Sequence, residues 1–329
     1  MAASALRLRL ISFNIRFATT QPSQDERPWT TRRPLVTNEL LFQTRYLDAY
    51  NTSTFICLQE VLHHQLKDVL QDLNSQSSRR MAQPYVGVKS EEVGTGLDVG
   101  IHQEPAWTHI GVGREDGDLR GEFCPIIYPV EAFELLHFEN RWLSPTPDQP
   151  SKGWDASNER LLTLGLFKHK STGRQIIACN THLDDKGSTA REMGIRIILD
   201  TMSRVRNNCK LVGEYPGVFL AGDFNSLPSQ EAYLTLAKSN SMVEMSELIP
   251  SEKRHGHKAT FSGFTTNNPQ DLKLGQIHRI DFIWLGPNET NEKTKWEVAG
   301  YAALPNLFDD NIHSSDHRCI VGDAILQDS

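Results

Sequence analysis

The chain has 329 residues, of which 38% are apolar and 23% charged, a composition typical of a globular protein with a sizeable core. Its formal net charge of -7 and pI of about 6.0 exclude a global positive field, which disfavours a non-specific binder of duplex nucleic acid. The five cysteines are scattered and lack Cys-x-x-Cys spacing, so neither a disulfide framework nor a structural zinc site is expected.

The first residues alternate apolar side chains with Arg7 and Arg9, as a strand does and a signal peptide does not. No stretch approaches the roughly 20 consecutive apolar residues that a membrane span requires. We therefore expect an intracellular protein of the cytoplasm, or of the nucleus, with no membrane span and no obligate protein partner.

Short apolar runs bounded by turn residues predict strands, and amphipathic stretches between them predict helices. In chain order we expect strand 6–16, helix 33–50, strand 54–59, helix 61–74, strands 84–88, 123–128, 132–138, 160–168 and 175–182, helix 187–206, strand 217–222, helix 228–239, and strands 279–285 and 318–324. No repeat or Gly/Ser linker divides the chain, so residues 1–329 are expected to form one layered α/β domain. Two packed sheets with helices outside is one such arrangement.

Polar side chains punctuate the apolar runs, mostly at strand ends, where a rigid scaffold can assemble a site. The positions are Asn14, Glu60, His182, Asp223, Asn225, Asp281, Asp316 and His317. Most have a structural alternative, such as a turn for Asn14 or a helix cap for Glu60. Asp281 is harder to explain in that way, because a carboxylate inside an apolar strand is costly without a partner. His317 is a natural partner, and the carboxylate would orient its ring and favour its cationic form.

Carboxylates and amide oxygens without a cysteine cluster make a hard, oxygen-rich set of ligands, which suits Mg²⁺ or Mn²⁺ better than Zn²⁺. Such a cation beside a histidine and an aspartate is the equipment for attack of water on a phosphoryl centre. The chain carries no Gly-x-Ser-x-Gly elbow, no Walker A loop and no His-Glu-x-x-His motif.

Six short blocks stand in a recognisable order: "SFNIR" (12–16), "LQE" (58–60), "NTHL" (180–183), "GDFN" (222–225), "RIDFIW" (279–284) and "SDH" (315–317). With them the chain resembles, from end to end, the endonuclease/exonuclease/phosphatase superfamily of DNase I-like enzymes. The resemblance implies a four-layer sandwich, in which two packed, mainly antiparallel β-sheets are flanked by helices. It also implies a metal-dependent hydrolase that acts on phosphoester bonds.

Carried over residue by residue, the resemblance implies a metal site. Glu60 would be the principal ligand of Mg²⁺ (or Mn²⁺), with Asn14 beside it and Asp316 close to the ion.

The resemblance implies catalytic roles for five further residues. Asp223 would orient or deprotonate the attacking water, and Asn225 would hold the water or the phosphate. His182 would contact the scissile phosphate, while Asp281 would pair with His317. Members of the superfamily are interpreted differently as to whether Asp223 or His317 is the base, so both remain open.

Four longer blocks are similar to a poorly characterised branch of bacterial and fungal proteins in this superfamily: "RPWTTRRPLV" (27–36), "GVGREDGDLRGEFCPIIY" (111–128), "WLSPTPDQPSKGWDASNER" (142–160) and "ATFSGF" (259–264). They supply candidate substrate-binding residues, which are Arg32, Arg120, Glu122, Trp154, Asp155 and Arg160. Arg120 is either a phosphate contact or a surface charge in a glycine-rich loop. Trp154 either stacks on a base or sugar or caps the core. Arg32 belongs either to a clamp for phosphate and ring or to a surface ion-pair cluster.

The leading hypothesis is a Mg²⁺-dependent phosphodiesterase that trims single-stranded RNA or DNA from one end, as a 3'-5' exonuclease does. Aromatic residues in the site loops would offer stacking platforms for bases; these are Trp29, Trp154, Phe261 and Phe264. The alternative is a phosphatase or phosphodiesterase of a small metabolite or lipid head group. An inactive binding scaffold is the alternative from another class, and it is disfavoured because chemically competent residues fill the core positions.

Overall fold

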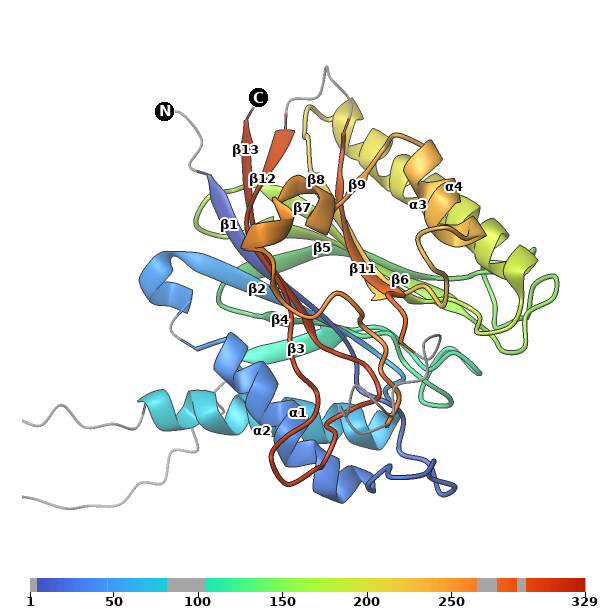
Figure 1. Ribbon diagram of the computed structural model, residues 1–329. Coiled ribbons are helices and arrows are strands. Elements are labelled where there is room, and N and C mark those ends of the chain that lie inside the picture. The colour runs from blue at the N-terminus through green and yellow to red at the C-terminus, as the bar shows by residue number, and fades with distance from the viewer. Residues whose placement is uncertain (1–4, 46, 82–104, 265–276, 289–293, 329) are drawn as a thin grey trace, which may run out of the picture.

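Two β-sheets stacked face to face form the centre of the computed structural model, which describes residues 5–45, 47–81, 105–264, 277–288 and 294–328 (Figure 1). One sheet has seven strands in the order β10-β12-β13-β1-β2-β4-β3. Its strands are β1 (Leu6–Asn14), β2 (Thr52–Gln59), β3 (Trp107–Ile110), β4 (Ile126–Pro129), β10 (His255–Gly256), β12 (Thr294–Ala303) and β13 (Ile320–Asp328).

The second sheet has six strands in the order β5-β6-β7-β8-β11-β9. They are β5 (Phe133–Trp142), β6 (Leu161–His169), β7 (Gln175–His182), β8 (Gly217–Asp223), β9 (Val243–Glu244) and β11 (Asp281–Gly286). Among the described strands, the pairs β1–β2, β10–β12 and β7–β8 are parallel and the others are antiparallel. The predicted pair of mainly antiparallel sheets is therefore confirmed.

Helices cover the outer face of each sheet (Figure 1). The apolar sides of α1 (Trp29–Gln43) and α2 (His63–Met81) pack on the seven-stranded sheet, and those of α3 (Ser188–Leu211) and α4 (Glu231–Lys238) pack on the six-stranded sheet. Three short 3-10 helices complete the described elements: η1 (Leu47–Tyr50), η2 (Met245–Leu248) and η3 (Ser251–Lys253). The layers run helix, sheet, sheet, helix, which is the four-layer, DNase I-like sandwich that the resemblance implies.

Aromatic rings fill the space between the sheets. The ring centroid of Phe55 on β2 lies 4.4 Å from that of Phe133, 5.0 Å from that of Phe167 and 5.4 Å from that of Phe219, all three of which lie on strands of the other sheet. Burying each such ring contributes about 1.5–3 kcal/mol to folding. This layer fixes the distance between the two sheets, and therefore the distance between side chains at their ends.

Nearly all predicted strands and helices are present, with shifts of up to seven residues at their ends: helix 33–50 is observed as α1 and ends at Gln43, and helix 61–74 is observed as α2 and ends at Met81. The predicted strand 84–88 lies outside the described residues. The prediction missed β3, β9 and β10, which have only two to four residues, and β12, in which a bulge between Val298 and Gly300 breaks the period-two alternation. All five cysteines are buried and free. Within the described ranges, no helix is long and apolar enough to span a bilayer.

Candidate active site

The polar residues at the strand ends converge on a cleft of about 560 Å³ between the ends of the two sheets. Residues of three kinds line it: carboxylates, nitrogen-bearing side chains and a few apolar residues. The full lining is Arg16, Phe17, Glu60, Glu122, Asn158, Arg160, His182, Asp185, Asp223, Asn225, Leu227, Gln230, Phe261, His278, Ile280, Asp316 and His317. Strand register explains much of the convergence, because Asp223 pairs with His182 on one side and with Asp281 on the other.

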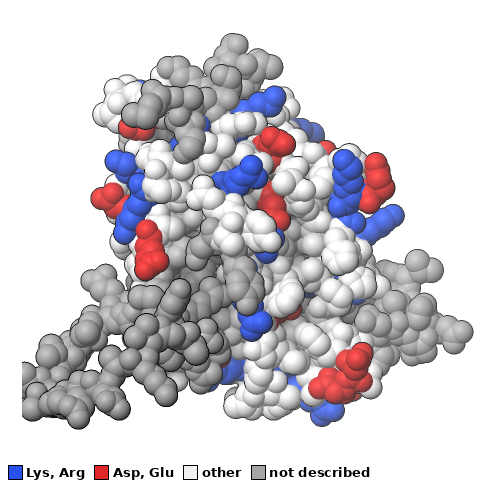
Figure 2. Space-filling view, turned by 90° about the vertical axis from the view of Figure 1, so that its left-hand side faces the viewer, with Lys and Arg blue, Asp and Glu red and all other residues white. Residues whose placement is uncertain are grey.

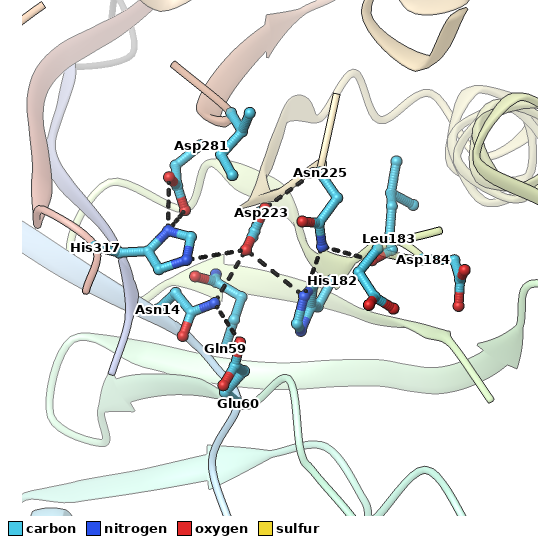
Figure 3. Close-up of polar contacts among 12 residues, drawn as sticks. Asn14, Gln59, Glu60, His182, Leu183, Asp184, Asp223, Asn225, Asp281 and His317 are labelled. Carbon is cyan, nitrogen blue, oxygen red and sulfur yellow. Dashed lines mark hydrogen bonds and ion pairs between the residues drawn. The ribbon is translucent and has the colours of Figure 1, made fainter. Parts of the chain in front are cut away.

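The seven-stranded sheet supplies Asn14, Glu60 and Asp316. Asn14 ends β1, is fully buried, and donates through Nδ2 to Glu60 Oε1 at 3.1 Å and to Asp223 Oδ2 at 3.0 Å (Figure 3). Its Oδ1 accepts the backbone N–H of Arg16 at 3.0 Å. In this geometry Asn14 therefore orients two carboxylates, and its own oxygen is already engaged.

Asp316 and Glu60 line the same cleft, and their negative charges interact. Burial raises the pKa of Asp316 to about 6; His317 and Arg16 oppose this rise, whereas the charge of Glu60 adds to it. Arg16 partly neutralises the pair from the side, since its Nη1 lies 3.6 Å from Glu60 Oε2. Two acidic groups held near each other in this way form a natural site for a cation.

Asp281 and His317 form a buried pair behind Asp223, as predicted. His317 Nδ1 lies 2.9 Å from Asp281 Oδ2, and His317 Nε2 lies 3.6 Å from Asp223 Oδ2 (Figure 3). Burial by itself would lower the pKa of His317, but the charges of Asp281 and Asp223 raise it well above its usual value. Both ring nitrogens thus face carboxylates, and the imidazolium form satisfies both.

A second histidine and carboxylate pair lies on the other side of Asp223 (Figure 3 shows the two rings). His182 Nε2 lies 3.0 Å from the amide nitrogen of Asn225, and its Nδ1 lies 3.6 Å from Glu122 Oε2. Glu122 also accepts a 2.8 Å hydrogen bond from Arg114. Burial would raise the pKa of Glu122, but contact with His182 and the charges of Arg114 and Arg160 lower it to about 2. An ionised Glu122 therefore orients His182.

Three residues of the cleft have left-handed backbone conformations although they are not glycine. The φ angles are 60° at Arg16, 59° at Glu60 and 46° at Asn225. Such conformations cost about 1–3 kcal/mol each and persist where the surroundings enforce them. Here they turn each side chain sharply out of the preceding strand and into the cleft.

The donor set of the cleft fits a hard divalent cation. Glu60 and Asp316 offer carboxylate oxygens, the ligands that Mg²⁺ and Mn²⁺ prefer. Asp223, Asp281 and His317 also offer ligand atoms within 4.8 Å of one another. In that trio, however, His317 Nδ1 is already bonded to Asp281, so the trio acts better as a proton-holding chain than as a metal shell.

Four of the six predicted substrate-binding residues do not line the cleft. Arg32 is 1% exposed, and its guanidinium donates to the carbonyls of Ile15, Arg16, Arg27 and Ser314, so it joins the backbone of three segments.

The other three face solvent or cap a helix. Arg120 has an exposed side chain beside Glu115, and Trp154 is 42% exposed in a left-handed turn. Asp155 accepts the backbone N–H groups of Thr189 and Ala190 in the first turn of α3, which is a cap. Glu122 and Arg160 do line the cleft.

The sequence assigned no role to five polar residues of the cleft, which are Arg16, Asn158, Asp185, Gln230 and His278. Arg16 stands in the block "SFNIR", so its proximity to the core set was visible. Asp185 follows the block "NTHL" by two positions, and Gln230 gives no signal in the sequence beyond its place before a helix.

No protein-family model and no curated protein matches the chain, whereas many solved structures do. An endonuclease/exonuclease/phosphatase family protein from Bacteroides thetaiotaomicron is 25% identical, with a TM-score of 0.74 over 98% of this chain and 96% of that one. Its counterpart from Bacteroides vulgatus is 26% identical, with a TM-score of 0.70 over 98% and 99%. A mannosyl-6-phosphatase from Bacteroides thetaiotaomicron is 25% identical, with a TM-score of 0.71 over 96% and 99%.

The sandwich fold, with an acidic and histidine-bearing cleft at the ends of both sheets, defines a phosphoesterase of the metal-dependent hydrolase class. The chain belongs to the endonuclease/exonuclease/phosphatase superfamily.

Proposed function

We propose that the protein is a Mg²⁺- or Mn²⁺-dependent hydrolase of a small phosphoester. The observation that carries the proposal is the cleft itself, where the carboxylates of Glu60 and Asp316 face Asp223 between two histidines. The residues that would hold the cation are Glu60 and Asp316, with Asn14 keeping Glu60 in place. When bound, the cation would neutralise the charge that develops on the phosphate oxygens.

The remaining residues divide the work of hydrolysis. Asp223 accepts the proton of the attacking water, because its Oδ2 lies in the cleft between the two rings. His317, held by Asp281, is better suited to stabilise negative charge as a cation than to act as a base. His182 and Asn225 bind the phosphate oxygens from the opposite side.

The nature of the cleft favours a small substrate over a nucleic-acid strand. Of the four aromatic residues expected to stack on bases, Trp29 and Phe264 are buried and Trp154 lies outside the cleft, while Phe261 lines it. The net charge of -7 supplies no global positive field for a nucleic-acid backbone, and basic and acidic side chains are interspersed on the face shown in Figure 2. The similarity to a mannosyl-6-phosphatase supports the same choice.

Trimming of single-stranded RNA or DNA from one end remains the second candidate. It is favoured by the ring pair of Phe261 and His278, which lie nearly parallel with centroids 6.4 Å apart and line the cleft. Such a pair could receive the base of a terminal nucleotide.

Hydrolysis of chromogenic esters tests the proposal. The purified protein is expected to hydrolyse p-nitrophenyl phosphate with Mg²⁺ or Mn²⁺ and to stop when EDTA is added. Glu60→Gln and Asp223→Asn are expected to lose at least about 10²-fold in kcat/KM. Activity that survives in both variants would overturn the assignment of the site. Faster turnover of bis-p-nitrophenyl phosphate and of a labelled oligonucleotide would favour the nuclease.

A further inference from the structure

The wall of the cleft next to His182 carries a carboxylate that faces solvent and is fixed in place. Asp185 Oδ1 accepts hydrogen bonds from Ser157 Oγ at 2.7 Å and from Arg160 Nη2 at 3.1 Å. Its side chain is 43% exposed, and Oδ2 has no partner among the described residues. Burial would raise the pKa of Asp185, but Ser157 and Arg160 lower it. Asp185 Oδ2 is therefore an ionised acceptor in the lining of the cleft.

A buried neighbour makes this wall rigid. Asp184 is 1% exposed and accepts the backbone N–H groups of Ser157 and Asn158 through one oxygen, and those of Lys186 and Gly187 through the other. The carboxylate of Asp184 thus joins the loop of residues 157–158 to its own loop at residues 186–187. Because both loops are held at the backbone, the positions of the side chains on the wall are set before any substrate arrives.

Two amides share the lining of the cleft with Asp185. Asn158 lies on the same loop as Ser157, and its Nδ2 donates to Ser157 Oγ at 3.1 Å. Gln230 precedes α4; its Oε1 accepts the backbone N–H of Leu227 at 2.7 Å, and its Nε2 has no partner in the described part of the chain. The wall therefore offers a charged acceptor, a neutral acceptor at Asn158 Oδ1 and a neutral donor.

Aromatic rings also line the cleft. The ring centroid of Phe261 lies 4.9 Å from that of His317, and the ring is nearly parallel to His278. His317 and His182 stand on opposite sides of Asp223 (Figure 3), and Phe261 packs on His317. A cleft that offers aromatic faces together with carboxylate and amide groups suits a molecule with a C–H face and several hydroxyls.

We propose that the alcohol part of the substrate is a polyol without a nucleobase, such as a free sugar or a cyclitol, whose hydroxyls bind Asp185, Asn158 and Gln230. The inference rests on the proposed function of the cleft and names the substrate class. In the reaction, water attacks phosphorus and the bond from phosphorus to the polyol oxygen breaks. That oxygen takes up a proton, so the products are the free polyol and inorganic phosphate.

The carboxylate of Asp185 decides between ligands. It cannot attract a second phosphate, because both groups are negative, so a polyanionic strand gains nothing from it. A hydroxyl donates to the carboxylate and still accepts from Gln230, so neighbouring hydroxyls satisfy the whole wall. An exocyclic amino group of a base would satisfy Asp185 alone, and a preference for AMP would reveal this mode of binding.

The test compares substrates that share a phosphate and differ in the alcohol. With Mg²⁺ present, kcat/KM is measured for glucose 6-phosphate, mannose 6-phosphate, 2-deoxyglucose 6-phosphate, AMP and p-nitrophenyl phosphate. At least one of the two hydroxylated sugar phosphates is expected to exceed both AMP and p-nitrophenyl phosphate by more than 10-fold. Asp185→Asn is expected to reduce kcat/KM on that sugar phosphate about 10- to 150-fold more than on p-nitrophenyl phosphate, the range for a hydrogen bond to a charged group.

Two further variants keep the result interpretable. Gln230→Ala leaves Arg160 and its contacts intact and is expected to shift selectivity in the same direction by a smaller factor. Asp200→Asn removes an exposed carboxylate of α3 outside the cleft and is expected to leave both rates unchanged. Equal losses on all substrates in Asp185→Asn and Gln230→Ala would reduce the wall to a structural role and overturn the inference, as would a preference for AMP.

Failure of the inference is distinguishable from failure of the proposed function. If the protein hydrolyses p-nitrophenyl phosphate but no sugar phosphate any faster, the polyol inference is wrong and the phosphoesterase stands. If no phosphoester is hydrolysed by folded protein with Mg²⁺ or Mn²⁺, the proposed function itself is wrong.

Discussion

The pair formed by Asp281 and His317 leads to the sharpest prediction, which concerns Asp281→Asn. The substitution keeps the shape of the side chain and removes its charge, while the 2.9 Å contact to His317 Nδ1 is the shortest that the ring makes. Without that charge, burial still disfavours the cationic form of the imidazole, and only the carboxylates of Asp223 and Asp316 favour it.

The magnitude follows from the strength of one charge-assisted hydrogen bond. Such a bond contributes about 1.5–3 kcal/mol. At 1.36 kcal/mol per pKa unit, its loss lowers the pKa of His317 by about one to two units. A group whose folded pKa is raised stabilises the fold below its unfolded value, near 6.5, and this contribution disappears as pH rises through the folded pKa. Asp281→Asn therefore costs stability chiefly at neutral and lower pH.

The assay is the pH dependence of kcat on p-nitrophenyl phosphate between pH 5 and 10, at saturating Mg²⁺, together with thermal unfolding at the same pH values. At neutral pH we expect kcat to fall by about 10²–10⁴-fold, the usual contribution of a positioned acid or base. We also expect the alkaline limb of the profile to move to lower pH by about one to two units. An unchanged alkaline limb with a lower plateau would refute a cationic role for His317.

Further predictions concern the metal, Arg32, Arg120 and Glu122. Because the pKa of Asp316 is raised to about 6, protons compete with the cation below that pH. Mg²⁺ at ten times its Kd should therefore raise Tm by a few degrees at pH 7.5 and only slightly at pH 5. In Glu60→Gln, Mg²⁺ should not raise Tm at either pH. Arg32→Leu leaves buried carbonyls unpaired and should lower the free energy of unfolding by about 3–5 kcal/mol, whereas Arg120→Met, at an exposed site, should change it by less than about 0.5 kcal/mol in urea titrations. The pKa of Glu122 is lowered to about 2, so its contribution to the free energy of unfolding is present above pH 4.5 and is lost as pH falls toward 2. In Glu122→Gln, the free energy of unfolding should therefore fall by up to about 3 kcal/mol less between pH 4.5 and pH 2 than in the wild type. The same pH dependence in both proteins would contradict an ionised Glu122.

The central sheets and the core of the site were predictable because they depend on local patterns. Alternation along β6 and the apolar runs of β2 and β8 mark strands, and a polar residue at the end of such a run must lie at a sheet edge. The buried charge of Asp281 demanded a partner, and the structure supplies His317. The strand β12 escaped prediction because its bulge destroys the pattern on which the prediction depends.

Substrate contacts were much harder to predict, because a sequence shows a side chain but not its direction. Arg32 and Arg120 look alike in the sequence, yet one is inside the fold and the other in solvent. Trp154 turns outward because its backbone is left-handed, and Asp155 is used by the first turn of α3. Asp185 becomes notable only once Ser157 and Arg160, from a distant loop, are seen to hold it.

The aromatic layer around Phe55 couples catalysis to the thickness of the core. Glu60 follows a strand of one sheet and Asp223 ends a strand of the other, so the gap between them is set by the rings that separate the sheets. A substitution there, far from any substrate atom, alters the spacing of the carboxylates as well as stability. The wall formed by Asp185, Asn158 and Gln230 lies on loops outside that layer. Selection can therefore change the alcohol that the enzyme accepts by altering the wall, while the reaction chemistry remains tied to residues that cannot vary without disturbing the fold.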